Sequence, residues 1–148
     1  MLRLAIPIFS FCLPLSFAAQ VARGDVDYNR DVRPILAENC YRCHGPDAAE
    51  RKAGLQLDME EAAFAALKSG GHAIVRGDVS KSELIARITA SDSSDLMPPP
   101  DSGKTLGPAE IETLRRWVKE GATWSEHWSF VAPVRPPLPA VKDVSWIR

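Results

Sequence analysis

Apolar residues recur at the spacing of amphipathic helices in four stretches of the chain. The first follows Asn29 or Asp31 as a helix cap, carries Pro34 in its opening turn and runs toward Cys40. The fourth begins at residues 107–108, where a proline stands at the first helical position, and ends at Gly121. These signals predict one helix near each end of a domain.

The two middle stretches begin with capping-box patterns, in which a cap residue is followed three positions later by a glutamate. Asp58 with Glu61 predicts a helix that stops at residues 70–71, and Ser80 with Glu83 predicts another. The four apolar faces contain Val32, Ile35, Leu36, Phe64, Leu67, Leu84, Ile85, Ile88, Ile111, Leu114, Trp117 and Val118. Short extended segments fit residues 55–57 and 73–75, but no sheet is predicted. We therefore expect a mostly α domain over about residues 25–124.

The first eighteen residues have the pattern of a secretory signal peptide. Arg3 precedes an almost continuous apolar run over residues 4–15, and small residues at 16–18 provide a cleavage site. The run is too short to span a membrane. A lipid anchor at Cys12 is not expected, because Phe11 occupies a position where a small residue is needed. We expect residues 1–18 to be removed and the protein to be exported, to the periplasm or another extracytoplasmic space.

Composition narrows the range of functions. The 148 residues are 45% hydrophobic and 25% charged, which is ordinary for a globular protein. Eighteen basic against nineteen acidic residues leave no positive excess for nucleic acid. The mature chain contains no run of about 20 apolar residues, so no transmembrane helix is predicted in it. No hydrolytic motif or phosphate-binding loop is present, so no catalytic residue is assigned.

The most informative motif is Cys40-Tyr41-Arg42-Cys43-His44, which has the C-x-x-C-H spacing of covalent c-type haem attachment. Two thiols one helical turn apart can add to the two vinyl groups of a porphyrin, and the adjacent histidine can present a ring nitrogen to the iron. The motif therefore predicts one covalent haem c, held by Cys40 and Cys43, with His44 as the proximal iron ligand.

Three other interpretations of the two cysteines remain open. A zinc site needs further ligands, and only His72 and His127 remain, isolated in the sequence. A thioredoxin-like redox pair requires a strand before the motif, whereas the preceding residues have a helical pattern. A structural disulfide suits an exported protein but leaves His44 unexplained.

Met97 is the candidate for the distal iron ligand, because a thioether is a soft, neutral ligand that raises the reduction potential of haem. The three prolines at residues 98–100 predict a stiff, extended backbone that can hold the sulfur in place. Met97 as a core residue, His72 in a glycine turn as the ligand and an open sixth position are the alternatives. Met59 is a weaker candidate, one residue beyond a predicted helix cap.

The tail after Thr123 differs from the rest of the chain. It combines aromatic residues with four prolines, Pro133, Pro136, Pro137 and Pro139. Such a segment cannot form a core helix. We expect residues 125–148 to be a semi-rigid linker, an arm that docks its aromatic side chains elsewhere, or the start of a following domain that is cut short.

The residues in 27–36, 40–46, 96–99 and 110–122 together resemble the planctomycete-type cytochrome c domain. The resemblance implies a class I-like cytochrome c fold in which helices near the two ends of the domain cross beside the haem. It also implies thioether links at Cys40 and Cys43 with His44 and Met97 on the iron. Gly107, in place of serine or threonine, departs from the pattern but affects no ligand. The tail resembles the opening of the large uncharacterised domain that usually follows this cytochrome domain.

The functional hypothesis is single-electron transfer outside the cytoplasm to a redox partner protein or to the following domain of the same polypeptide. Near-neutral charge favours a tethered partner over fast diffusional encounter. A haem with an open sixth position that binds ligands or acts on peroxide or oxygen is one alternative, and a structural module that docks a larger enzyme is another. Apolar side chains expected to keep water from the haem are Leu36, Leu84, Ile88, Leu96, Leu114 and Trp117.

Overall fold

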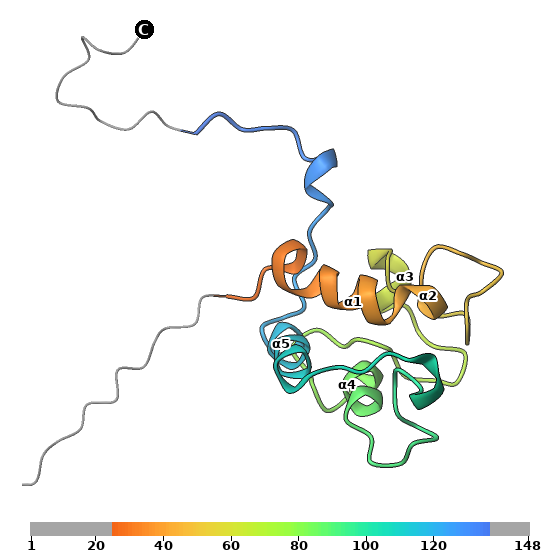
Figure 1. Cartoon of the computed structure of the whole chain (residues 1–148). Helices are drawn as coiled ribbons and strands as arrows, with labels where there is room; N and C mark the ends of the chain where they lie inside the picture. Colours follow the sequence, from red (N-terminus) through yellow and green to blue (C-terminus); the bar gives the residue numbers. More distant parts are fainter. Residues whose placement is uncertain (1–24, 137–148) are drawn as a thin grey trace, which may run out of the picture.

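The computed structural model describes residues 25–136 (Figure 1). Helices and turns make up its regular structure, and within this range there is no strand, only isolated bridges of His72 with Ala66 and Ser82. The expected mostly α fold is confirmed. In chain order the elements are η1 (Tyr28–Val32), α1 (Arg33–Asn39), α2 (Tyr41–His44), α3 (Glu60–Phe64), α4 (Glu83–Ile88), η2 (Pro100–Ser102), α5 (Pro108–Lys119) and η3 (Trp128–Phe130).

The elements η1, α1 and α2 follow one another almost without interruption and lead the chain to the Cys40–His44 motif (Figure 1). The prediction of Asn29 or Asp31 as the first cap is wrong. Asp27 is the cap, and its Oδ1 accepts a 2.7 Å hydrogen bond from the amide of Arg30. The helical segment therefore begins at Tyr28, two residues earlier than a cap at Asn29 would give, with a π-helical turn.

The starts predicted for the two middle helices are also displaced. Helix α3 begins at Glu60 rather than after Asp58, and it ends at Phe64, so Leu67 lies outside it. Helix α4 begins at Glu83, after Ser82. Ser80 does not cap it, because its hydroxyl donates to Asp78, whose carboxylate also accepts from the amides of residues 80 and 81. A local polar turn thus takes up the Ser80 side chain that the sequence assigned to a helix cap.

Helix α5 follows its predicted start closely. Gly107 precedes Pro108, and the Glu110 carboxylate accepts a 2.7 Å hydrogen bond from the Gly107 amide. Only this half of a capping box can form, since glycine has no side chain. The buried face of α5 is Leu114, Trp117 and Val118, as the spacing predicts. Helix α5 contacts both α4 and η1, so the two ends of the domain pack against one core.

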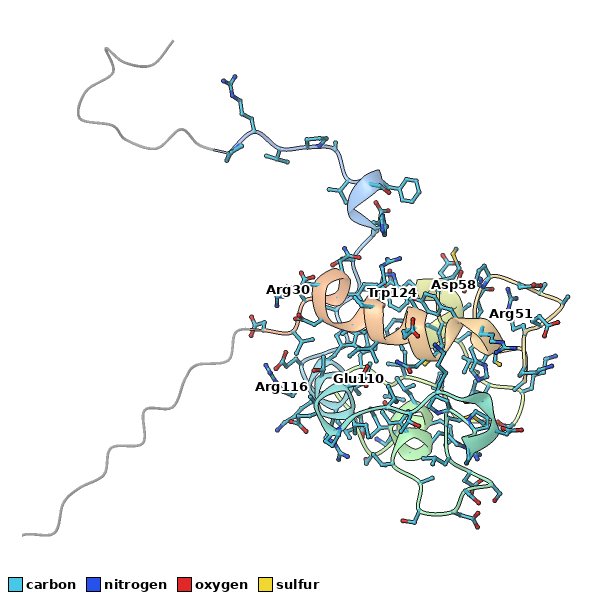
Figure 2. All side chains as sticks on the ribbon, in the orientation of Figure 1. Arg30, Arg51, Asp58, Glu110, Arg116 and Trp124 are labelled. Carbon is cyan, nitrogen blue, oxygen red and sulfur yellow. The ribbon has the colours of Figure 1, made fainter. Side chains whose placement is uncertain are left out.

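An aromatic cluster joins the N-terminal segment to the chain that leaves α5. The ring of Trp124 stacks on Tyr28 at a centroid distance of 4.1 Å, and the ring of Trp117 lies 5.6 Å from that of Tyr28. Two side-chain hydrogen bonds extend the docking, because the side chains of Asn29 and Arg33 donate to the carbonyl oxygens of residues 126 and 125. The chain is therefore fastened to the domain as far as Glu126, and Figure 2 shows Trp124 close to the N-terminal helices.

Farther along the tail, the side chains of Phe130, Val131 and Val134 are exposed, and this segment lies apart from the helical body in Figure 1. The expected signal peptide at residues 1–18 and the last part of the tail, 137–148, lie outside the described residues. Among the helices of residues 25–136, none has the length and apolar character needed to cross a membrane.

Candidate cofactor site

A cavity of about 710 Å³ brings together all four residues that the sequence assigned to haem. Its walls include Cys40, Cys43 and His44 from the first part of the chain and Met97 from a segment more than fifty residues later. Its size is within the range of roughly 300–1,000 Å³ that is usual for cofactor sites. Two thiols, an imidazole and a thioether therefore line the same cavity.

Helix α2 sets the spacing of the motif. The amides of Cys43 and His44 donate to the carbonyl oxygen of Cys40 at 3.1 and 2.8 Å, so the two cysteines lie one turn apart. Both thiols are free and half-buried. Burial raises the pKa of the Cys40 thiol to about 12, and the neighbouring Cys43 adds to the shift. Cys40 is therefore a protonated thiol at neutral pH in this structure.

Gly45 permits a close approach directly after the motif. A Cβ atom at this position would lie 2.2 Å from the carbonyl oxygen of Tyr41, a distance that real contacts do not allow. Gly45 is buried, and Arg51 closes the turn by donating to the carbonyl oxygens of Gly45 and Pro46 at 3.0 Å. The site thus requires glycine at the position that follows its histidine.

The loop after Gly45 returns to the motif and forms a wall of the cavity. The amide of Lys52 donates to the carbonyl oxygen of Cys43 at 2.8 Å, and that of Leu57 donates to the carbonyl oxygen of His44 at 2.7 Å. These two bonds tie residues 52–57 to the backbone of α2. Leu55 and Leu57 then contribute apolar side chains to the cavity.

Burial favours the neutral form of the His44 imidazole. It lowers the pKa of the ring, and the nearby backbone at Lys52 and Leu55 opposes this shift without forming a hydrogen bond to Nδ1. Its Nδ1 atom is buried and has no hydrogen-bond partner in the described part of the chain. A neutral ring with a buried, unsatisfied nitrogen suits metal ligation, which requires an unprotonated nitrogen.

Met97 reaches the cavity through its attachment to α4. Its amide donates to the carbonyl oxygen of Arg87 at 3.1 Å, and Pro98 and Pro99 line the cavity beside it. The proline run is extended only as far as Pro99, with φ −60° and ψ 144°, because the 3-10 turn η2 follows. Met97 itself is half-buried.

The other candidates for the distal ligand do not reach this space. Met59 is 56% exposed and His72 is exposed, and neither lines the cavity. His127 lies in the tail, where its Nδ1 is 2.8 Å from the hydroxyl of Ser129. No group of three or more potential zinc ligands occurs among residues 25–136.

The apolar residues expected to exclude water divide into two groups. Leu84 and Ile88 on α4 line the cavity, whereas Leu36, Leu114 and Trp117 belong to the buried core, and Leu96 is half-buried without lining the cavity. Sequence reasoning missed the remaining apolar walls, Leu55, Leu57, Leu67 and Ala73. They come from irregular segments. The short extended pattern at 55–57 and 73–75 gave a signal for three of them, and Leu67 was expected on a helix that in fact ends at Phe64.

Comparison with known families agrees with this site. Residues 40–101 match the family model described as Planctomycete cytochrome C, a range that begins at Cys40 and includes Met97. No curated protein and no solved structure gives a significant match. The match covers less of the chain than the resemblance noted in the sequence, but it contains all four proposed haem-binding residues. The match supports a planctomycete-type cytochrome c domain near the N-terminus, and a cytochrome c family suggests haem binding and electron transfer.

Proposed function

We propose that the domain is a c-type cytochrome that holds one haem covalently and transfers single electrons outside the cytoplasm. The observation that carries this proposal is the convergence of Cys40, Cys43, His44 and Met97 on one largely apolar cavity. The donor set fits the cofactor, because c-type attachment requires two thiols and iron ligation by His and Met requires an imidazole and a thioether.

When bound, haem supplies an iron that changes between the ferric and ferrous states. Cys40 and Cys43 would hold the porphyrin through thioether bonds. The neutral His44 would provide the proximal nitrogen, and Met97 would provide a sulfur that favours the ferrous state and raises the potential. His44 and Met97 together would leave no position on the iron open to a substrate, which suits an electron carrier.

The surroundings of the four residues support this role. Leu84 and Ile88 place hydrocarbon against the cavity, and the loop at 52–57 is fixed to α2 by backbone hydrogen bonds. Rigid, apolar walls limit the rearrangement of protein and water when the charge of a buried metal changes. The electron partner would be a redox protein or a domain joined through the tail.

Intact mass and stoichiometry test the covalent part of the proposal. The full chain, exported by a host with a c-type maturation system, should carry one haem per polypeptide that remains attached under denaturing conditions. Replacement of both Cys40 and Cys43 by serine should abolish the attachment. Haem that is lost on denaturation, or that stays attached in the double variant, contradicts the proposal. Cleavage near Ala19 in the same mass spectrum would support export.

A further inference from the structure

Charged side chains around the cavity are not balanced, although the whole chain has a formal net charge of only −1. Five basic and two acidic residues line it: Arg42, Lys52, Lys68, Arg87, Lys104, Glu38 and Glu83. Both carboxylates are already paired, Glu83 with Arg87 at 2.8 Å and Glu38 with Lys104. In the described part of the chain, Arg42, Lys52 and Lys68 form no ion pair, so the cavity has a local positive excess.

Lys52 and Lys68 belong to two segments that touch at the cavity wall. The amide of Lys52 is bonded to the carbonyl oxygen of Cys43, which fixes this residue against the motif. Ala53 and Gly54 then adopt left-handed conformations, with φ of 53° and 70°, in a tight turn. The side chain of Lys68 lies over this turn, since a Cβ on Gly54 would be 3.3 Å from its Cε and 3.5 Å from its Nζ.

The backbone of the turn favours this arrangement. A left-handed conformation is unfavourable for alanine, and it persists at Ala53 where the surrounding structure imposes it. Glycine at position 54 leaves room for the lysine stem above the turn. The result is an exposed ammonium group at the wall of the cavity, over the turn that follows Lys52, without a carboxylate partner among residues 25–136. Arg42, the third basic residue without an ion pair within the described residues, does not belong to this turn, because it lies on α2 between the two cysteines.

We propose that Lys52 and Lys68 form a carboxylate-binding site at the cavity wall, whose ligand is the carboxylate side chains of the porphyrin. The inference rests on the proposed function. Haem carries two carboxylates on an otherwise apolar ring, and these groups need cations or water when the ring enters an apolar cavity. The two lysines would fix the orientation of the ring and neutralise negative charge close to the iron.

The reduction potential tests this assignment in the full, haem-loaded chain. Lys52→Met and Lys68→Met remove the charge but keep a long apolar side chain. An unneutralised carboxylate stabilises ferric iron, so each variant should lower the midpoint potential at fixed pH and salt, and the double variant should lower it further. Lys68→Arg should restore most of the shift at that position. Lys119→Met on α5, outside the cavity, is the control and should leave the potential unchanged.

Each outcome has a distinct meaning. A double variant with the wild-type potential overturns the carboxylate site. If the potential is unchanged but reduction of ferricyanide, an anionic oxidant, becomes slower, the lysines face external anions instead, and the proposal is likewise overturned. Absence of covalent haem in the wild-type chain would contradict the proposed function itself, a result that the denaturing mass measurement distinguishes from failure of the lysine site.

Discussion

The amide of Met97 donates a 3.1 Å hydrogen bond to the carbonyl oxygen of Arg87, which attaches the proposed distal ligand to the last turn of α4. The side chain of Arg87 reinforces this link. Its guanidinium contacts Glu83 at 2.8 Å within the helix and Asp95 at 2.5 Å in the segment just before the methionine. One residue therefore joins the helix to the Met97 segment through both its backbone and its side chain.

Substitution Arg87→Gln should loosen the Met97 segment while the fold remains intact. Because the ion pairs are partly exposed and screened by solvent, their loss should lower the free energy of unfolding only slightly. In the optical spectrum of the oxidised haem protein, ligation by the Met97 sulfur should give a sulfur-to-iron charge-transfer band. In the variant this band should nevertheless disappear at a lower temperature than in the wild type. Arg115→Gln on α5, which has no carboxylate partner among the described residues, is the matched control. Equal thermal loss of the band in both variants would contradict the positioning role.

Substitution Met97→Ala should remove the distal ligand. The midpoint potential should fall by on the order of 100 mV, a fraction of the ~0.8 V range over which axial ligands tune haem. Carbon monoxide should then bind the reduced protein rapidly without denaturant. Met59→Ala is the control, because Met59 is exposed and outside the cavity. Rapid, stoichiometric binding of carbon monoxide to the wild type would instead favour a haem with an open sixth position.

Substitution Gly45→Ala should destabilise the haem-binding segment. The added methyl group would meet the carbonyl oxygen of Tyr41, and relief of this overlap must displace the C-terminal end of α2. We expect a loss of about 2 kcal/mol in the free energy of unfolding and a lower yield of protein with attached haem. At Gly107, by comparison, a methyl group would make only an ordinary contact with Glu110, and Gly107→Ala should cost less than about 1 kcal/mol.

The docked part of the tail should contribute to stability. Trp124→Ala removes a half-buried indole that stacks on Tyr28, and it should lower the free energy of unfolding by about 2 kcal/mol. A chain that ends at Ala122 should melt at a lower temperature than the full chain, whereas one that ends at His127 should melt like it. Identical melting temperatures of all three chains would show that residues 123–126 do not stabilise the domain.

The turn before α4 should lose stability in acid. Hydrogen bonds from Ser80 and Lys81 lower the pKa of Asp78 from 3.8 to about 2. Since the carboxylate form is favoured in the folded state, its stabilisation is complete above the unfolded pKa and disappears as the pH falls from about 4 toward 2. The Asp78→Asn variant should therefore have a lower melting temperature than the wild type at pH 7. The difference in melting temperature should shrink as the pH falls from about 4 toward 2. A difference that does not change with pH would contradict this cause.

Much of the fold followed from local signals in the sequence. The proline and glycine around α5 marked its start, and the apolar spacing identified Leu114, Trp117 and Val118 as its buried face. The predicted caps at positions 58 and 80 were wrong, because Ser80 bonds to Asp78 in a turn and the Asp58 carboxylate accepts from the side chain of Gln56 instead of a helix amide. The contact of Trp124 with Tyr28 joins distant parts of the chain, so no local pattern could reveal it.

The candidate site shows a similar division. The C-x-x-C-H spacing and the Met-Pro run indicated four residues that the structure gathers in one cavity. The walls at Leu55, Leu67 and Ala73 lie outside the helices, and the positive excess at Lys52 and Lys68 depends on which neighbours form ion pairs. Such features arise from tertiary packing, which spacing along one chain does not encode.

The optical spectrum of the exported, full-length protein tests the central claim most directly. Recorded in the oxidised state and then after reduction, it should show sharp reduced bands of a covalently attached haem and a weak oxidised-state band near ~695 nm from ligation by methionine sulfur. Covalent haem without that band would contradict the role of Met97. A protein that matures without any covalent haem would contradict the assignment of Cys40, Cys43 and His44 and return the two cysteines to disulfide or metal chemistry.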